Sequence, residues 1–281
     1  MQNVILNNGI EMPILGFGVY RIQDLKVCEQ SVYNAIKAGY RLIDTASLYY
    51  NEEAVGKAIK RSGVPREEMF ITTKLWLSDA NYDGAKKAFE ISLDKLQLDY
   101  LDLYLIHAPY NDVYGAWRAM EELYNEGRIR AIGISNFTMD RMIDLALYNE
   151  VAPSINQIEI HPFFQQPEST AYMQENNVQA EAYSPFAAGR TNLFENQLLK
   201  EIGASYGKSA AQVTLRWLIQ RGIVAIPKSV HNERIIENID IFDFELSEED
   251  MEKITILDTN IGVYLLHTDP EIVKQFKEFD K

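Results

Sequence analysis

The chain alternates short apolar runs with longer stretches of helical period, and this alternation constrains its fold more than any other feature. The apolar runs lie near residues 14–18, 40–44, 69–74, 101–106, 130–134, 154–159, 178–183 and 223–227. The helical stretches lie near residues 24–38, 52–62, 81–97, 113–126, 138–149, 168–176, 194–206 and 232–239. Strands that alternate with helices are typical of βα units in a parallel sheet. Eight such units make a (β/α)8 TIM barrel, so the sequence predicts this α/β fold.

The main alternative fold is a doubly wound sheet that binds a dinucleotide. Its fingerprint needs a third glycine, which the segment GFGVYR at residues 16–21 lacks. No Pro/Gly/Ser-rich linker or charge block divides the chain, so we expect one domain over residues 1–281. We also expect a hairpin around residues 7–9 before the barrel and an extra C-terminal helix near 247–258, with the tail 259–281 outside the repeat.

Charge and composition narrow the range of partners. The net charge of −14 repels nucleic acid and anionic membrane surfaces, so a ligand with phosphates would need a local basic pocket. The single cysteine, Cys28, excludes intramolecular disulfides and Cys-rich metal sites. The sequence shows no signal run and no stretch of about 18 apolar residues. We therefore expect a cytoplasmic protein, a monomer, without a metal, nucleic-acid or membrane partner.

Polar side chains stand where the predicted strands end. The second strand ends at Asp44, the third at Lys74 and the fourth at His107. The later strands end on or near Ser135, Asn136, Gln157, Glu159, His161, Tyr183, Ser184, Lys228 and Ser229. A barrel collects the C-terminal ends of its strands at one mouth, where such enzymes keep their active sites. The sequence therefore predicts an active site at this mouth.

Four residues in this register could together transfer a proton. Each has a plain structural interpretation: Asp44 and Lys74 as a buried ion pair, Tyr49 as a ring at the edge of the core, His107 as a structural histidine. A tyrosine, with a pKa of about 10, donates poorly at neutral pH unless a nearby ammonium favours its phenolate. Lys74 would supply that charge, and Asp44 would keep Lys74 protonated. Neutral His107 would orient a substrate oxygen.

The motifs around these residues resemble those of the aldo-keto reductase family over nearly the whole chain. In family order they are DTASLYYNE (44–52), TKLW (73–76), IHAP (106–109), GISNF (133–137), NQ (156–157), YSP (183–185), IPKS (226–229) and RIIEN (234–238). The chain is most similar to small bacterial members that resemble diketogluconate, glyoxal or prostaglandin-F-synthase-like reductases. The resemblance implies NADPH-dependent reduction of aldehydes or ketones to alcohols. Ala108 replaces a tryptophan of many animal members, so we expect a different substrate pocket.

The resemblance also implies a role for each site residue. Tyr49 would be the proton donor, tuned by Asp44 and Lys74, and His107 would position the carbonyl. The residues that it implies for cofactor binding are Gly18, Val19, Tyr20, Asp44, Ser135, Asn136, Gln157, Tyr183, Ser184, Pro185, Phe186, Lys228, Ser229, Val230, Arg234, Glu237 and Asn238. Substrate would contact Tyr20, Tyr49, Trp76 and His107, in an aromatic pocket that Tyr50, Tyr110 and Tyr264 extend.

Arg234 stands near the N-terminal end of the last predicted barrel helix, where a cation opposes the helix dipole. An anion between the two would remove this cost, because helix N-termini bind phosphates. We therefore expect Arg234 to contact the 2′-phosphate or the adenine of NADPH, with further contacts from Lys228 and Ser229. Two other functions stay open: a non-catalytic NADP(H)-binding regulatory subunit on the same fold, and a barrel isomerase or lyase that binds a sugar phosphate.

Overall fold

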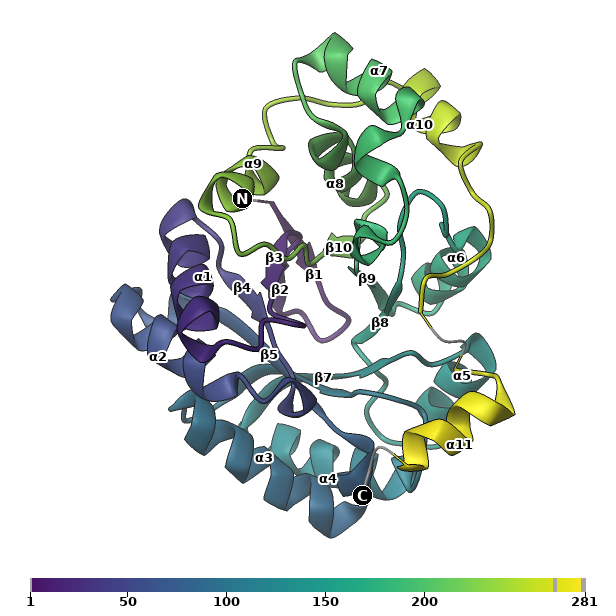
Figure 1. Cartoon of the computed structure of the whole chain (residues 1–281). Coiled ribbons are helices and arrows are strands. Elements are labelled where there is room, and N and C mark those ends of the chain that lie inside the picture. The colour runs from purple at the N-terminus through teal and green to yellow at the C-terminus, as the bar shows by residue number, and fades with distance from the viewer. Residues whose placement is uncertain (1, 265–266, 279–281) are drawn as a thin grey trace.

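The computed structural model describes residues 2–264 and 267–278. One parallel sheet contains β3 (Gly16–Gly18), β4 (Leu42–Asp44), β5 (Phe70–Leu75), β6 (Leu101–Ile106), β7 (Ile129–Ser135), β8 (Ile155–Glu159), β9 (Gln179–Tyr183) and β10 (Val224–Ala225), in chain order (Figure 1). A parallel bridge between Leu15 and Ala225 joins the last strand to the first, and the Gly18 amide donates to the Pro227 carbonyl at 3.0 Å. The sheet therefore closes, and the prediction of a (β/α)8 barrel is confirmed.

Helices surround the barrel (Figure 1). They are α1 (Leu25–Ala38), α2 (Glu52–Ser62), α3 (Tyr82–Leu96), α4 (Val113–Asn125), α5 (Met139–Leu147), α6 (Pro167–Glu175), α7 (Gln197–Tyr206), α8 (Ala210–Gln220), α9 (Asn232–Ile239), α10 (Glu248–Thr255) and α11 (Pro270–Glu278). The sequence did not predict α8 or α11. Residues 210–219 of α8 are all buried, so this helix has no exposed polar face to reveal its period.

A hairpin closes the N-terminal end of the barrel. It pairs β1 (Asn3–Ile5) with β2 (Glu11–Pro13) in antiparallel register, as the sequence predicted. The Asn7 side chain donates to the Pro153 carbonyl at 3.0 Å, and the Asn8 side chain donates to the Arg130 carbonyl at 2.9 Å. These acceptors lie where β8 and β7 begin. The hairpin therefore covers the bottom of the barrel and leaves the opposite mouth for ligands.

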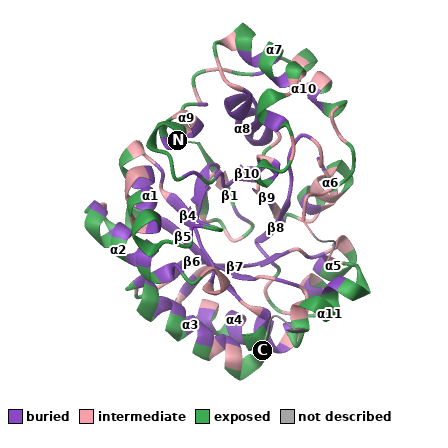
Figure 2. Cartoon of the chain, viewed as in Figure 1, coloured by how far each residue is buried: buried purple, intermediate pink, exposed green. Residues whose placement is uncertain are grey.

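The barrel strands are largely buried, while the outward faces of the helices are exposed (Figure 2). Every residue of β5 and β6 is buried, because the barrel interior covers one face of the sheet and the helices cover the other. The buried positions include the ionisable side chains of Asp44, Lys74 and Glu181. Such groups need partners when water is excluded, so they mark the place to look for a site. Within the part of the chain that is described, no helix is both long and apolar enough to cross a membrane.

Candidate active site

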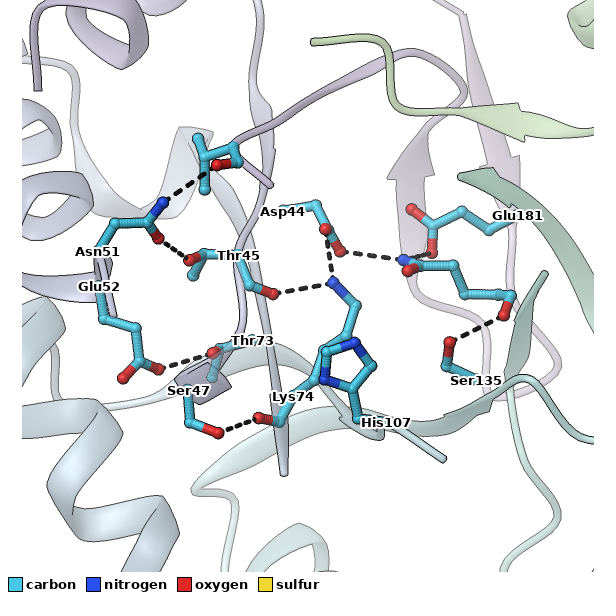
Figure 3. A network of polar contacts seen from close by, with 12 residues as sticks. Asp44, Thr45, Ser47, Asn51, Glu52, Thr73, Lys74, His107, Ser135 and Glu181 are labelled. Carbon is cyan, nitrogen blue, oxygen red and sulfur yellow. Dashed lines mark hydrogen bonds and ion pairs between the residues drawn. The ribbon is translucent and has the colours of Figure 1, made fainter. Parts of the chain in front are cut away.

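A buried ion pair forms the centre of the site. Lys74 and Asp44 lie on neighbouring strands, and the Lys74 Nζ atom is 2.5 Å from Asp44 Oδ1 and 2.9 Å from the Thr45 carbonyl oxygen (Figure 3). The Lys74 side chain is fully buried, and the Asp44 side chain is 3% exposed. The second oxygen of Asp44 accepts a hydrogen bond of 3.0 Å from the Gln157 amide. Both charges are therefore satisfied by protein groups alone.

Tyr49 ends the short 3-10 helix η1 (Ser47–Tyr49) just after β4. Hydrogen bonds of the surrounding motif fix this loop: the Ser47 hydroxyl donates to the Lys74 carbonyl at 2.9 Å, and the Thr45 hydroxyl donates to the Asn51 side chain at 2.9 Å. The polar residues after Asp44 thus hold the loop in place. Tyr50 differs from its neighbour, because its φ of 55° turns it outward and leaves it 78% exposed. The expectation that Tyr50 lines the pocket is wrong.

The predicted residues meet at the mouth. The Lys74 ammonium lies 5.1 Å from the centre of the Tyr49 ring. The Tyr49 and His107 rings are 5.6 Å apart at 75°, and the Trp76 ring is 5.1 Å from His107. The structure therefore brings Asp44, Tyr49, Lys74 and His107 into one cluster, with an aromatic ring beside it.

Burial decides the protonation of Tyr49 and His107. Burial, with a contribution from Asp44, raises the pKa of Tyr49 well above its ordinary value. Burial, with the charge of Lys74 adding to it, lowers the pKa of His107 well below its ordinary value. At neutral pH the phenol is thus protonated and the imidazole is neutral. The phenolate that Lys74 was expected to favour is disfavoured here, because burial removes its charge from water and Asp44 places a second negative charge nearby.

A cavity of about 720 Å³ opens above this cluster. The predicted residues on its wall are Gly18, Tyr20, Asp44, Tyr49, Trp76, His107, Ser135, Asn136, Gln157, Tyr183, Ser184, Pro185, Phe186, Lys228, Arg234 and Tyr264. Wall residues that the sequence did not single out include Arg21, Leu48, Arg190, Phe194, His267 and Phe276. The cavity thus joins the charged cluster to the Arg234 end of the barrel mouth.

Some residues predicted to bind the cofactor are not on this wall, namely Val19, Ser229, Val230, Glu237 and Asn238. Ser229 Oγ accepts a hydrogen bond from the His231 amide, and Glu237 accepts one from the Ser209 hydroxyl. These bonds give both side chains a structural role at the start of α9 and of α8. Their contacts to a cofactor stay predictions.

The strand ends of β7 to β9 form the floor of the cavity. The Asn136 amide donates to the His107 carbonyl at 3.0 Å, and the Tyr183 hydroxyl donates to Asn136 Oδ1 at 2.8 Å. The Ser135 hydroxyl donates to the Gln157 carbonyl at 2.9 Å. Asn136 has a φ of 63°, a left-handed conformation that asparagine tolerates better than most residues. The floor is therefore a connected network that reaches the strand carrying His107.

The C-terminal segment completes one side of the cavity. Buried Glu159 accepts backbone hydrogen bonds from Val263 at 2.6 Å and Tyr264 at 3.2 Å, and it pairs with His161 at 2.9 Å. The Tyr264 ring then lies 6.4 Å from the Tyr20 ring across the cavity. Glu159 and His161 were predicted as polar residues at a strand end. The sequence did not predict that they hold the C-terminal segment in place.

The sequence also gave no role to Glu181, in the middle of β9. Its side chain is fully buried inside the barrel, where its Oε2 atom accepts a hydrogen bond of 3.0 Å from the Gln157 amide. Burial and the negative charge of Asp44 raise the pKa of Glu181 to about 8. A glutamate between two alanines in a predicted barrel strand was the available signal.

The closed barrel, with its acid, lysine, tyrosine and histidine at the C-terminal mouth, defines a class of enzymes that the comparisons identify. Residues 15–259 match the aldo/keto reductase family, and the chain belongs to this family. The glyoxal reductase of Bacillus subtilis (strain 168) is 52% identical over 264 residues, which cover 93% of this chain and 95% of that protein. The methylglyoxal reductase of Escherichia coli (strain K12) is 44% identical over 256 residues, which cover 90% and 92%.

Solved structures agree with this assignment. An aldo-keto reductase of Bombyx mori, crystallised in complex with NADP, matches with a TM-score of 0.91 and 36% identity, over 97% of this chain and 96% of that one. The predictions of the family and of the oxidoreductase class are confirmed.

Proposed function

We propose that the chain reduces small uncharged aldehydes and dicarbonyls to alcohols with NADPH, with Tyr49 as the proton donor. One observation carries the proposal: Tyr49 and His107 stand at the cavity wall, directly above a buried Asp44–Lys74 pair. A phenol and a neutral imidazole at one point can both hydrogen-bond to a carbonyl oxygen.

The cavity suits a dinucleotide with phosphates. In a chain of net charge −14, its wall carries Arg21, Arg190, Lys228 and Arg234. Burial lowers the pKa of Lys228, and the positive charge of Arg21 lowers it further. This is the local basic pocket that such a ligand requires, and the Bombyx mori relative was solved with NADP. NADPH, when bound, supplies the hydride.

This chain's own residues would hold and deliver the proton. Tyr49 is protonated at neutral pH because burial raises its pKa. A buried phenol is a weak acid, but an alkoxide is a stronger base than a phenolate, so the proton can pass to the oxygen as it gains negative charge. An N–H group of neutral His107 and the positive charge of Lys74 would stabilise that oxygen during the transfer. Trp76 packs edge-on against His107 and would limit the access of water.

The wall of the cavity favours uncharged substrates. The rings of Tyr20, Trp76, Tyr264, His267 and Phe276 line the part beside Tyr49. Burial lowers the pKa of His267 to about 4, so this ring is neutral at physiological pH. A carboxylate placed here would lose its hydration without gaining a full positive charge from the aromatic wall. The substrates named for the two bacterial relatives, glyoxal and methylglyoxal, are small and uncharged.

The test is NADPH oxidation by the purified chain with a panel of carbonyls. We expect turnover with glyoxal, methylglyoxal and uncharged aldehydes, and much weaker turnover with 2-oxo acids of the same size. A regulatory subunit would bind NADPH, seen as quenched protein fluorescence, without turnover of any member of the panel. A sugar-phosphate isomerase would show neither response. We expect a monomer to be sufficient, because every residue of the proposed mechanism comes from one chain.

A further inference from the structure

The amide of Gln157 lies between two acids. Its Nε2 atom donates to Asp44 Oδ2 and to Glu181 Oε2, each at 3.0 Å, and Figure 3 draws both contacts. An amide nitrogen carries two N–H bonds, so both are in use. Gln157 also lines the cavity, and no residue in 2–264 or 267–278 donates a hydrogen bond to its Oε1 atom. The oxygen end of the amide is therefore the end available to a ligand.

We propose that Glu181 is a positioning residue, which holds the Gln157 amide so that its oxygen accepts a hydrogen bond from the nicotinamide carboxamide. This inference rests on the proposed function, because it takes NADPH to bind in the cavity with its carboxamide beside Gln157, a wall residue that the family resemblance assigns to cofactor binding. The oxygen and nitrogen ends of an amide are alike in shape, and rotation of the side chain exchanges them. With Asp44 as its only acceptor, the amide would keep a free N–H that could turn toward the cavity. With both acids as acceptors, neither N–H group of the Gln157 amide can point at the carboxamide N–H. The amide oxygen faces the carboxamide instead and can accept its hydrogen bond.

The strand register places Glu181 where it can do this. Gln157 and Glu181 are direct partners on the parallel strands β8 and β9, so their side chains leave the sheet on the same face, inside the barrel. The charged groups that face Glu181 from neighbouring elements are Asp44 on β4 and Lys74 on β5. With its pKa raised to about 8, Glu181 is mostly neutral at pH 7. A neutral carboxyl still accepts through its carbonyl oxygen, so the contact to Gln157 persists.

A purely structural role explains Glu181 poorly. Its side chain is fully buried, so its carboxyl group has lost its hydration. Its Oε1 atom has no hydrogen-bond partner in the described part of the chain. An unpaired buried acceptor destabilises a fold, and an apolar side chain of similar size would fill the same space at lower cost. The contact with Gln157 gives the acid a role that an apolar side chain could not fill.

The experiment compares two cofactors on two variants. Glu181→Met removes the acceptor and fills the space, whereas Glu181→Gln can keep an acceptor oxygen toward Gln157. The dissociation constant is measured by fluorescence quenching for NADPH and for its 3-acetylpyridine analogue, in which an acetyl group without N–H replaces the carboxamide. We expect Glu181→Met to weaken NADPH by about threefold to tenfold, the range of one neutral hydrogen bond. The analogue should change by less than about twofold, because it has no N–H to lose.

The conservative variant should bind both cofactors nearly as the wild type does. Equal losses for NADPH and the analogue in Glu181→Met would mean that Glu181 only supports the fold, and would overturn the inference. An unchanged affinity for NADPH in that variant would overturn it as well. Failure of the proposed function gives a different result: a chain that binds no NADPH would show no quenching even in the wild type, and a chain that binds NADPH without reducing carbonyls would be revealed by turnover of the carbonyl panel, which this binding test does not use. Thermal unfolding of each variant shows that the protein compared is folded.

Discussion

Replacing Lys74 by methionine tests whether the buried ion pair has a catalytic role apart from its structural one. The Lys74 Nζ atom contacts Asp44 Oδ1 at 2.5 Å and the Thr45 carbonyl at 2.9 Å, in a place where both charged side chains are almost wholly buried. Methionine has a similar length but no charge. The variant would leave Asp44 buried, with the Gln157 amide as its one side-chain partner among the described residues. Removing one member of a buried pair costs about 3–5 kcal/mol of the free energy of unfolding.

The matched control is the double variant Asp44→Asn, Lys74→Met, which removes both charges. Exchanging a buried ion pair for neutral groups is often nearly neutral for stability, so we expect it to recover most of the loss. Activity should not recover, because Tyr49 lacks its neighbouring ammonium in both variants. Urea denaturation gives the stability, and kcat is measured on folded protein below the transition. A folded variant without Lys74 that reduces aldehydes at the wild-type rate would refute the catalytic role of the ammonium. A double variant as unstable as the single one would refute the assigned cause of instability.

Other predictions follow from separate parts of the site. Arg234→Ala should raise the dissociation constant of NADPH about tenfold to a hundredfold while NADH changes little, since a hydrogen bond to a charged group contributes about 1.5–3 kcal/mol; equal losses would show that Arg234 does not contact the 2′-phosphate. A Cβ atom at Gly262 would lie 2.8 Å from Glu159 Oε2. Gly262→Ala should therefore shift the tail and raise KM for bulky aromatic aldehydes, but not for glyoxal; Ile261→Ala, at a residue 70% exposed, is the control, and a uniform effect on all substrates would contradict this. Burial raises the pKa of Glu181 from 4.5 to about 8, so between these values the folded state holds a proton that the unfolded state has released, and wild-type stability falls as pH rises. Glu181→Gln removes this pH dependence. Urea denaturation between the two pKa values should therefore show the free energy of unfolding of the variant rising relative to that of the wild type by at most about 1.4 kcal/mol per pH unit. A difference in unfolding free energy that does not change with pH would contradict the raised pKa.

The site residues at the strand ends could be predicted because they follow from barrel geometry. Each apolar run ends at a recognisable polar residue, and a closed parallel sheet brings all of these ends to one mouth. Asp44, Lys74 and His107 were found in this way without any knowledge of their distances. The structure places Asp44, Tyr49 and His107 on one cavity wall, with Lys74 fully buried against Asp44.

The features that the sequence could not predict depend on which way a side chain points or on contacts between residues far apart in the chain. Tyr49 and Tyr50 are adjacent and alike, and only the left-handed conformation of Tyr50 decides which ring faces the cavity. The bond from Val263 to Glu159 spans 104 residues and has no local signal. Glu181 belongs to no motif that we recognised, and its inward direction follows only from its register with Gln157.

The central claim is that Tyr49 donates the proton, and the most direct measurement is kcat for aldehyde reduction by Tyr49→Phe at saturating NADPH. Tyr50→Phe is the matched control, since it removes the same hydroxyl from a ring that is 78% exposed. We predict that Tyr49→Phe binds NADPH with unchanged affinity and loses about 10²–10⁴-fold in kcat, the range for general acid catalysis, while Tyr50→Phe keeps nearly full activity. A folded Tyr49→Phe variant with a kcat close to that of the wild type would contradict the claim.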